Sequence, residues 1–138
     1  MTGLHSRARI LLIDDDDAVR SLLHRVLTER GHTVVEASNG DEGLKLFPTV
    51  QADLLITDIM MPGKSGLDVL TELRDSKSPF KAIAISGGSR HGEEDGLQRA
   101  KALGAAKVLA KPFSCDVLIA AVDELLSAGG ADSRDAGR

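Results

Sequence analysis

The sequence predicts an α/β fold in which a five-stranded parallel sheet is doubly wound, with helices on both faces. Two observations support this prediction. Short apolar segments rich in β-branched residues alternate with longer segments of helical periodicity, and 138 residues suit a single hydrophobic core. Each crossover between parallel strands is right-handed and returns the chain to the same sheet, so five such units in series build one layered domain.

Five segments have the composition of buried strands. Their apolar runs are mostly continuous rather than alternating, as expected where helices cover both faces of a parallel sheet. The predicted strands are Ile10 to Ile13, Thr33 to Glu36, Leu54 to Thr57, Ala82 to Ile85 and Val108 to Ala110.

Five helices are predicted to follow these strands. The first and the last carry apolar residues three and four positions apart, which gives each helix one face for the sheet, and Ser114 suits the N-cap of the last. The fourth contains Gly96 and follows a glycine-rich segment, so we expect it to be the least stable and most mobile. The predicted helices are Ala18 to Leu27, 41 to 47, 65 to 75, 93 to 103 and Val117 to Leu126.

Composition and charge argue against several classes of protein. The net charge is −4 and the lysines and arginines are dispersed, so no basic stripe could neutralise nucleic-acid phosphates. No apolar run reaches the roughly 18 residues of a membrane helix, and no secretory signal is present, so we expect a cytoplasmic location.

The domain is predicted to span residues 8 to 127, after an extension at 1 to 7. Residues 128 to 138 are glycine-rich and polar and predict a disordered tail.

Charged and polar residues stand where the predicted strands end. Asp14 to Asp17 follow the first strand, and Asp58, Ser86 and Lys111 follow the third, fourth and fifth. The carboxyl ends of parallel strands share one edge of a sheet, so these side chains should converge. Crowded carboxylates raise one another's pKa unless a cation lies among them. Oxygen donors without a nearby histidine or cysteine favour Mg2+.

A purely structural interpretation of these residues stays open. Aspartates after a strand can cap the following helix and complement its dipole, and we assign that role to Asp16 and Asp17. Lys111 could be an exposed lysine before a proline turn, and Ser86 a turn residue at a strand end.

Four motifs lie at or next to the predicted strand ends, one after another along the chain. They are ILLIDDD at 10 to 16, DLLITDIMMPGKSG at 53 to 66, Ser86 with Gly87, and KPF at 111 to 113. Together they resemble the receiver domain of bacterial two-component response regulators, over about residues 8 to 127. The resemblance implies a (βα)5, flavodoxin-like fold and a regulator of the stand-alone, single-domain type.

The resemblance also implies the roles of the site residues. Asp58 would be the phosphoacceptor. Asp15, Asp58 and the Met60 backbone carbonyl would bind Mg2+, with Asp14 reaching the ion through water. Ser86 and Lys111 would hold phosphoryl oxygens, and the peptide bond between Lys111 and Pro112 would be cis.

The function implied is a phosphorelay switch rather than an enzyme. The phosphoryl donor would be a phosphohistidine of a sensor kinase or of a phosphotransfer protein, and an unknown protein target would read the switch on the face from the fourth strand to the last helix. Val108 stands where the family usually has an aromatic residue, so we expect a switch of smaller amplitude, or one carried by backbone movement. Met60 and Gly88 are expected to tune the phosphoryl lifetime. The kinase, the target and the oligomeric state stay open.

Two other functions are weighed against the switch. A Mg2+-dependent aspartyl phosphatase typically needs a second aspartate two residues after the nucleophile, and that position holds Met60. An interaction module that uses the fold without phosphoryl chemistry is disfavoured by the joint presence of Asp14, Asp15, Asp58, Ser86 and Lys111, although Val108 keeps that hypothesis open.

Overall fold

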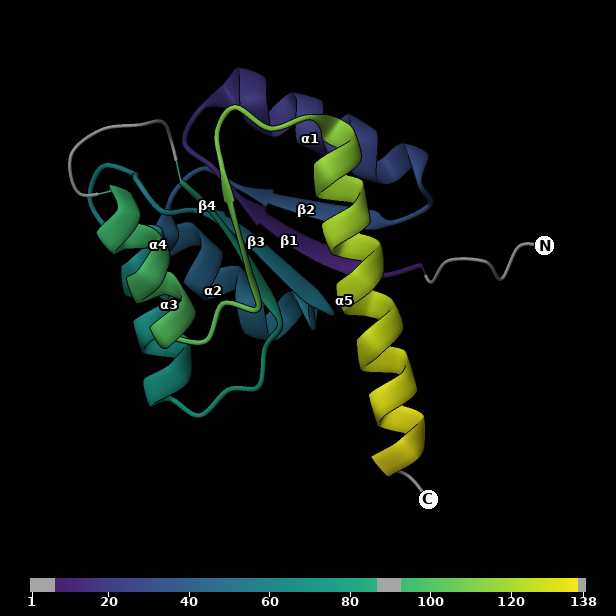
Figure 1. Ribbon diagram of the computed structural model, residues 1–138. Coiled ribbons are helices and arrows are strands. Elements are labelled where there is room, and N and C mark those ends of the chain that lie inside the picture. Colours follow the sequence, from purple (N-terminus) through teal and green to yellow (C-terminus); the bar gives the residue numbers. More distant parts are fainter. Residues whose placement is uncertain (1–6, 87–92, 137–138) are drawn as a thin grey trace.

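The computed structural model describes residues 7 to 86 and 93 to 136, in which five strands and five helices alternate (Figure 1). The strands are β1 (Arg9–Ile13), β2 (Thr33–Ala37), β3 (Leu54–Asp58), β4 (Ala82–Ser86) and β5 (Lys107–Ala110). The helices are α1 (Asp17–Glu29), α2 (Gly40–Val50), α3 (Gly66–Asp75), α4 (Glu93–Ala102) and α5 (Cys115–Ala136).

All four strand pairings are parallel, and the strand order is β2-β1-β3-β4-β5. The order reverses between β1 and β3, because the chain first builds outward to β2 and then crosses back over β1. In a doubly wound sheet a crevice opens at such a point, beyond the carboxyl ends of the strands. The predicted fold class is therefore confirmed, and the topology places the crevice beside β1 and β3.

The core has two layers, one on each face of the sheet. Residues on alternate sides of the central strands divide between them: Leu11 and Ile13 pack with α2, α3 and α4, whereas Ile10 and Leu12 pack with α1 and α5. These four side chains have no exposed surface. Burying one leucine or isoleucine side chain contributes about 1.5 to 3 kcal/mol, so the sheet is rigid where it carries the site.

Side-chain caps start the helices next to that crevice. The Asp16 carboxylate accepts hydrogen bonds from the amides of Ala18 and Val19, which confirms its predicted capping role. Ser65 and Asp68 form the capping box predicted for α3. These caps satisfy amides that the first turn leaves without helical partners, and they fix where each helix leaves its strand-end loop.

Helices α2 and α5 continue well past their predicted ends. We expected α2 to end before Pro48, but the helix continues to Val50, because a proline in the last turn removes a single hydrogen bond. The tail predicted as disordered from residue 128 also differs, since α5 continues through Gly129 and Gly130 to Ala136. Glycine lowers helix propensity by only about 1 kcal/mol, and no proline interrupts this stretch. Within the described part of the chain, no helix is long and apolar enough to cross a membrane.

Candidate functional site

Four of the predicted site residues meet at the carboxyl edge of the sheet. Asp14 follows β1, Asp58 ends β3, Ser86 ends β4 and Lys111 follows β5. The parallel register sets these strand ends side by side, with Asp58 opposite Ile85 and Ser86 opposite Ala110. The convergence predicted from the sequence is therefore present in the structure.

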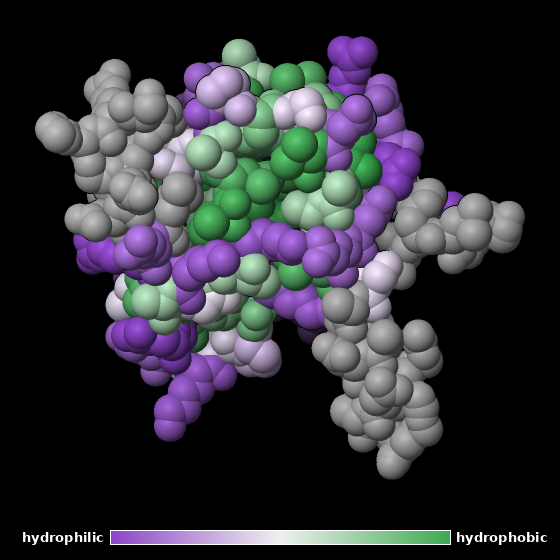
Figure 2. All heavy atoms as spheres, in the orientation of Figure 1, coloured by the Kyte–Doolittle hydropathy of each residue, from purple (hydrophilic) through white to green (hydrophobic). Residues whose placement is uncertain are grey.

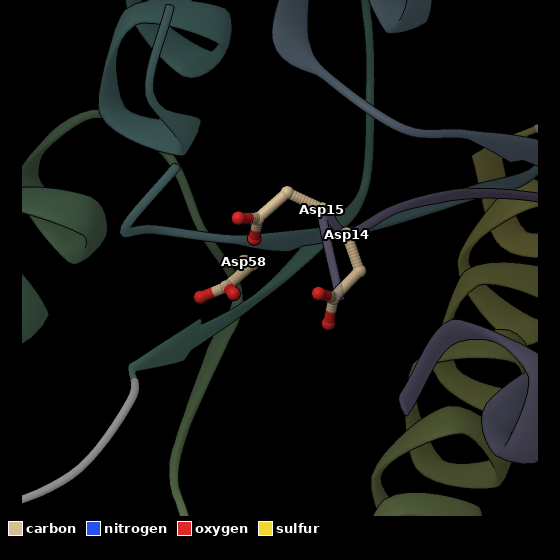
Figure 3. A group of neighbouring side chains, drawn as sticks. All are labelled: Asp14, Asp15 and Asp58. Carbon is tan, nitrogen blue, oxygen red and sulfur yellow. The ribbon is translucent and has the colours of Figure 1, made fainter. Parts of the chain in front are cut away.

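Three carboxylates form a compact acidic group at this edge (Figure 3). Asp14, Asp15 and Asp58 each offer one oxygen, and these oxygens all lie within 4.8 Å of one another. Asp14 and Asp58 are buried, with exposed fractions of 1% and 5%, whereas Asp15 is exposed. Two carboxylates of the acidic group are thus shielded from solvent, and the third, Asp15, is in contact with it.

Lys111 is the cation that faces the acidic group. Its Nζ lies 3.6 Å from Asp58 Oδ2 and 3.9 Å from Asp14 Oδ2. The peptide bond between Lys111 and Pro112 is cis, as the resemblance implied. One ammonium group cannot balance two ionised carboxylates, and the third carboxylate, Asp15, increases the excess of negative charge.

The backbone after β3 wraps around Asp58. The Met60 amide donates a hydrogen bond to Asp58 Oδ1 at 3.3 Å, while Met60 itself is 67% exposed. Gly66 packs so closely that a Cβ there would lie 2.2 Å from the Asp58 carbonyl oxygen. Gly66 ends the motif at 53 to 66, but sequence spacing alone does not reveal this close backbone approach.

Ser86 stands at the end of β4 with an exposed fraction of 2%. Its carbonyl accepts a hydrogen bond from the Lys111 amide at 2.8 Å, which ties the two strand ends together. Gly87 and Gly88, to which the sequence also pointed, lie outside the described residues.

Burial dominates the electrostatics of the acidic group. It raises the pKa of Asp58 from its ordinary 3.8 to about 6, against the attraction of Lys111 and together with the repulsion of Asp14. Burial also raises the pKa of Asp14. A carboxylate out of water is stabilised in its neutral form unless positive charge compensates for the lost hydration.

The donor set fits a hard divalent cation. Asp14 Oδ1 accepts the Asp16 amide, but Asp14 Oδ2 is buried and has no hydrogen-bond donor among the described residues. A buried carboxylate oxygen in this state is costly, and a cation among the three carboxylates would relieve it. The available ligand atoms are oxygens, which Mg2+ prefers.

An apolar cavity of about 240 Å3 opens beside this site, between α1 and the chain that joins β5 to α5. Val19, Leu22 and Leu23 line one side, and Lys111, Pro112 and Phe113 line the other. Leu22 is 49% exposed. Figure 2 shows hydrophobic side chains gathered on the face that carries β5 and the start of α5.

The raised pKa of Asp58 predicts how stability varies with pH in the absence of metal ions. A pKa above its unfolded value means that the protonated group contributes stability below pH 3.8, and that this stability is lost as the pH rises through about 6. Asp58→Asn should therefore raise the free energy of unfolding at pH 7.5 by about 2 to 3 kcal/mol, and by little at pH 4.

Urea unfolding in EDTA at the two pH values measures this difference. Asp41→Asn, which changes an exposed aspartate at the start of α2, should shift stability by less than about 0.5 kcal/mol. An Asp58→Asn variant no more stable than the wild type at pH 7.5 would show that the buried charge carries no such cost.

Comparison with known proteins agrees with this geometry. A family model described as the response regulator receiver domain matches residues 10–123. Sporulation initiation phosphotransferase F of Bacillus subtilis (strain 168) is 31% identical over 118 residues, which are 86% of this chain and 93% of that protein. Sensor kinase CckA of Brucella abortus (strain 2308) is 35% identical over 127 residues, which are 91% of this chain but 13% of that protein.

The solved structures agree as well. A response regulator receiver domain protein from Clostridium thermocellum matches with a TM-score of 0.81 and 31% identity, and the match covers 90% of this chain and 98% of that chain. The matched region of the family includes every strand of the sheet except the first residue of β1, and all of the acidic group. The chain therefore belongs to the response regulator receiver domain family, whose members work in phosphorylation-based two-component signalling.

Proposed function

We propose that this chain is a response regulator receiver domain that accepts a phosphoryl group on Asp58 in a Mg2+-dependent reaction. The observation that carries the proposal is the placement of Asp58, buried at the end of β3 with Lys111 Nζ 3.6 Å away and two more carboxylates beside it. The donor is a phosphohistidine of a sensor kinase or of a phosphotransfer protein.

The reaction transfers a phosphoryl group between two nucleophiles. An Asp58 carboxylate oxygen forms a bond to phosphorus as the bond from phosphorus to the histidine nitrogen breaks, and that nitrogen keeps the electron pair. The product is an aspartyl phosphate. The transition state spreads charge over three phosphoryl oxygens, so the role of this chain is to hold the nucleophile and supply positive charge.

Each residue of the site has a place in this scheme. Lys111, a flexible point charge, holds one phosphoryl oxygen, and the Ser86 hydroxyl donates a hydrogen bond to another. Asp15, Asp58 and the Met60 carbonyl would hold Mg2+, and Asp14 would reach the ion through water. When bound, Mg2+ supplies charge neutralisation at the remaining phosphoryl oxygen.

Acetyl phosphate, a small phosphoryl donor, tests the reaction without a partner protein. Incubation with Mg2+ should add one phosphoryl group to the chain, which intact mass spectrometry detects. No partner protein is needed, because the nucleophile and the positive charges that stabilise the transition state all belong to this site. EDTA should abolish the adduct, and so should Asp58→Asn.

The same experiment separates the other functions. Rapid multiple turnover of the donor would support a phosphatase, which Met60 disfavours since a general acid is missing from that position. Absence of any adduct on the wild type would contradict the proposal and support a phosphorylation-independent interaction module.

We propose that the phosphohistidine donor docks over the apolar cavity between α1 and the β5–α5 connection. The cavity shares Lys111 with the acidic group, so a partner seated there is held next to Asp58. Leu22 lines the cavity and keeps half of its surface exposed, as an anchor for a partner does.

Because a sensor kinase draws its phosphoryl group from ATP, we also propose that the exchange takes place in the cytoplasm.

Leu22→Glu tests this docking surface. With a phosphotransfer domain that phosphorylates the wild type, transfer should slow at least about tenfold, equivalent to ~1.4 kcal/mol of lost binding energy. The rate with acetyl phosphate should stay unchanged, because this donor needs no docking surface. Ser21→Glu, on the neighbouring exposed position of α1, is the matched control. Equal slowing with both donors would contradict the docking role.

We further propose that the signal leaves through the face from β4 and α4 to α5. An added phosphoryl group brings about −1.5 to −2 charges, which draw Ser86 toward Asp58 and bias the chain that follows β4. Val108 in β5 pairs with Ala84 and packs against the core layer under α4. Its stiff side chain replaces the usual aromatic residue, so backbone movement carries the change, with a small amplitude.

Amide hydrogen exchange tests the switch. Beryllofluoride, a phosphoryl mimic, added with Mg2+ should slow exchange between residues 86 and 110, and should have no effect on Asp58→Asn. Identical exchange across that segment with and without the mimic would refute a switch on this face.

A further inference from the structure

Arg20 in α1 connects three parts of the molecule beside the acidic group. Its Nη1 donates to the Asp14 carbonyl oxygen at 2.7 Å, its Nη2 to Asp17 Oδ1 at 2.6 Å and its Nε to Glu36 Oε1 at 2.9 Å. The Arg20 side chain is 14% exposed, so the guanidinium group is largely withdrawn from water. The bonds to Asp17 and Glu36 raise its pKa.

The bond to Asp14 is the one that concerns the site. This hydrogen bond holds the main chain at Asp14, the first residue of the loop that follows β1 and also carries Asp15. The Asp14 amide on the other side bonds to the Ala37 carbonyl at 3.1 Å. With its amide and carbonyl both held, this residue has a fixed orientation, and the direction of the next residue, Asp15, is constrained by it.

Glu36 anchors Arg20 from the second strand. One of its oxygens accepts from Arg20 and the other lies 2.6 Å from His24 Nδ1. The guanidinium group is planar and presents its donors in a fixed fork, so it can serve a backbone carbonyl and two carboxylates at once. A lysine ammonium group in the same place could not keep this geometry.

We propose that Arg20 is a positioning residue for the metal site, which holds the β1–α1 loop so that Asp14 and Asp15 face Asp58. The inference rests on the proposed Mg2+ site and assigns it a residue outside its ligands. Surface ion pairs alone contribute about 0 to 1 kcal/mol, but a partly buried fork on the loop carbonyl acts on the geometry of the ligands.

Titration calorimetry with MgCl2 tests the role of Arg20. Arg20→Gln should weaken Mg2+ binding by about tenfold or more, the range found when partners of metal ligands are removed. Arg20→Lys, which keeps the charge but not the fork, should fall between Arg20→Gln and the wild type. Arg25→Gln is the matched control, because Arg25 forms an exposed ion pair with Glu29 on the same helix and no other ion pair within the described part of the chain.

A second readout separates positioning from stability. The rise in melting temperature on adding Mg2+ reports metal binding whatever the starting stability. It should be smaller for Arg20→Gln than for the wild type and unchanged for Arg25→Gln. If Arg20→Gln does not fold, Glu36→Ala takes its place, since it removes the oxygen that accepts from Arg20 Nε and leaves the loop residues intact.

The outcomes distinguish this inference from the proposed function. Equal Mg2+ affinity and equal Mg2+-induced melting shifts for the wild type and Arg20→Gln would overturn the positioning role alone. Absence of Mg2+ binding by the wild type would overturn the metal site, and the positioning role with it.

Discussion

Two almost fully buried carboxylates, Asp14 and Asp58, end neighbouring strands, and the rest of the site is arranged around the cost of keeping them charged. Burial raises the pKa of both groups, and repulsion from Asp14 adds to the rise at Asp58. Lys111 compensates for only part of this charge, and one oxygen of Asp14 has no hydrogen-bond donor among the residues described. Carboxylates with this unrelieved charge favour the binding of a divalent cation.

The fold supplies the rigidity that such a site requires. Asp58 ends one central strand and Asp14 directly follows another, and both strands are buried on both faces, so these two carboxylates cannot move apart without disturbing the core. Gly66 lets α3 begin against the Asp58 backbone, and Arg20 clasps the loop after β1. Packing at Gly66 and hydrogen bonds from Arg20 thus help to hold the three carboxylates close together, although neither residue belongs to the acidic group.

Sequence patterns predicted the elements that depend on local chemistry. Continuous apolar runs identified all five strands, and the residues following them identified the acidic group and Lys111, because parallel strands share one edge. The lengths of α2 and α5 were missed, since proline and glycine shift helix boundaries by amounts that neighbouring contacts decide. Arg20 was missed because it lies in α1 and its partner Glu36 in β2, and no spacing rule joins the two positions. Gly66 depended on a backbone approach that only the folded chain reveals.

The central claim is that a single dication joins the carboxylates of two strands and, with Lys111, holds a phosphoryl group on Asp58. A crystal structure of the chain with Mg2+ and beryllofluoride tests it most directly. Our account predicts beryllofluoride on an Asp58 oxygen, Mg2+ bound by Asp15, Asp58 and the Met60 carbonyl, and Lys111 Nζ within hydrogen-bond distance of a fluorine. Mg2+ bound elsewhere, or Lys111 turned away from an unmodified Asp58, would contradict it.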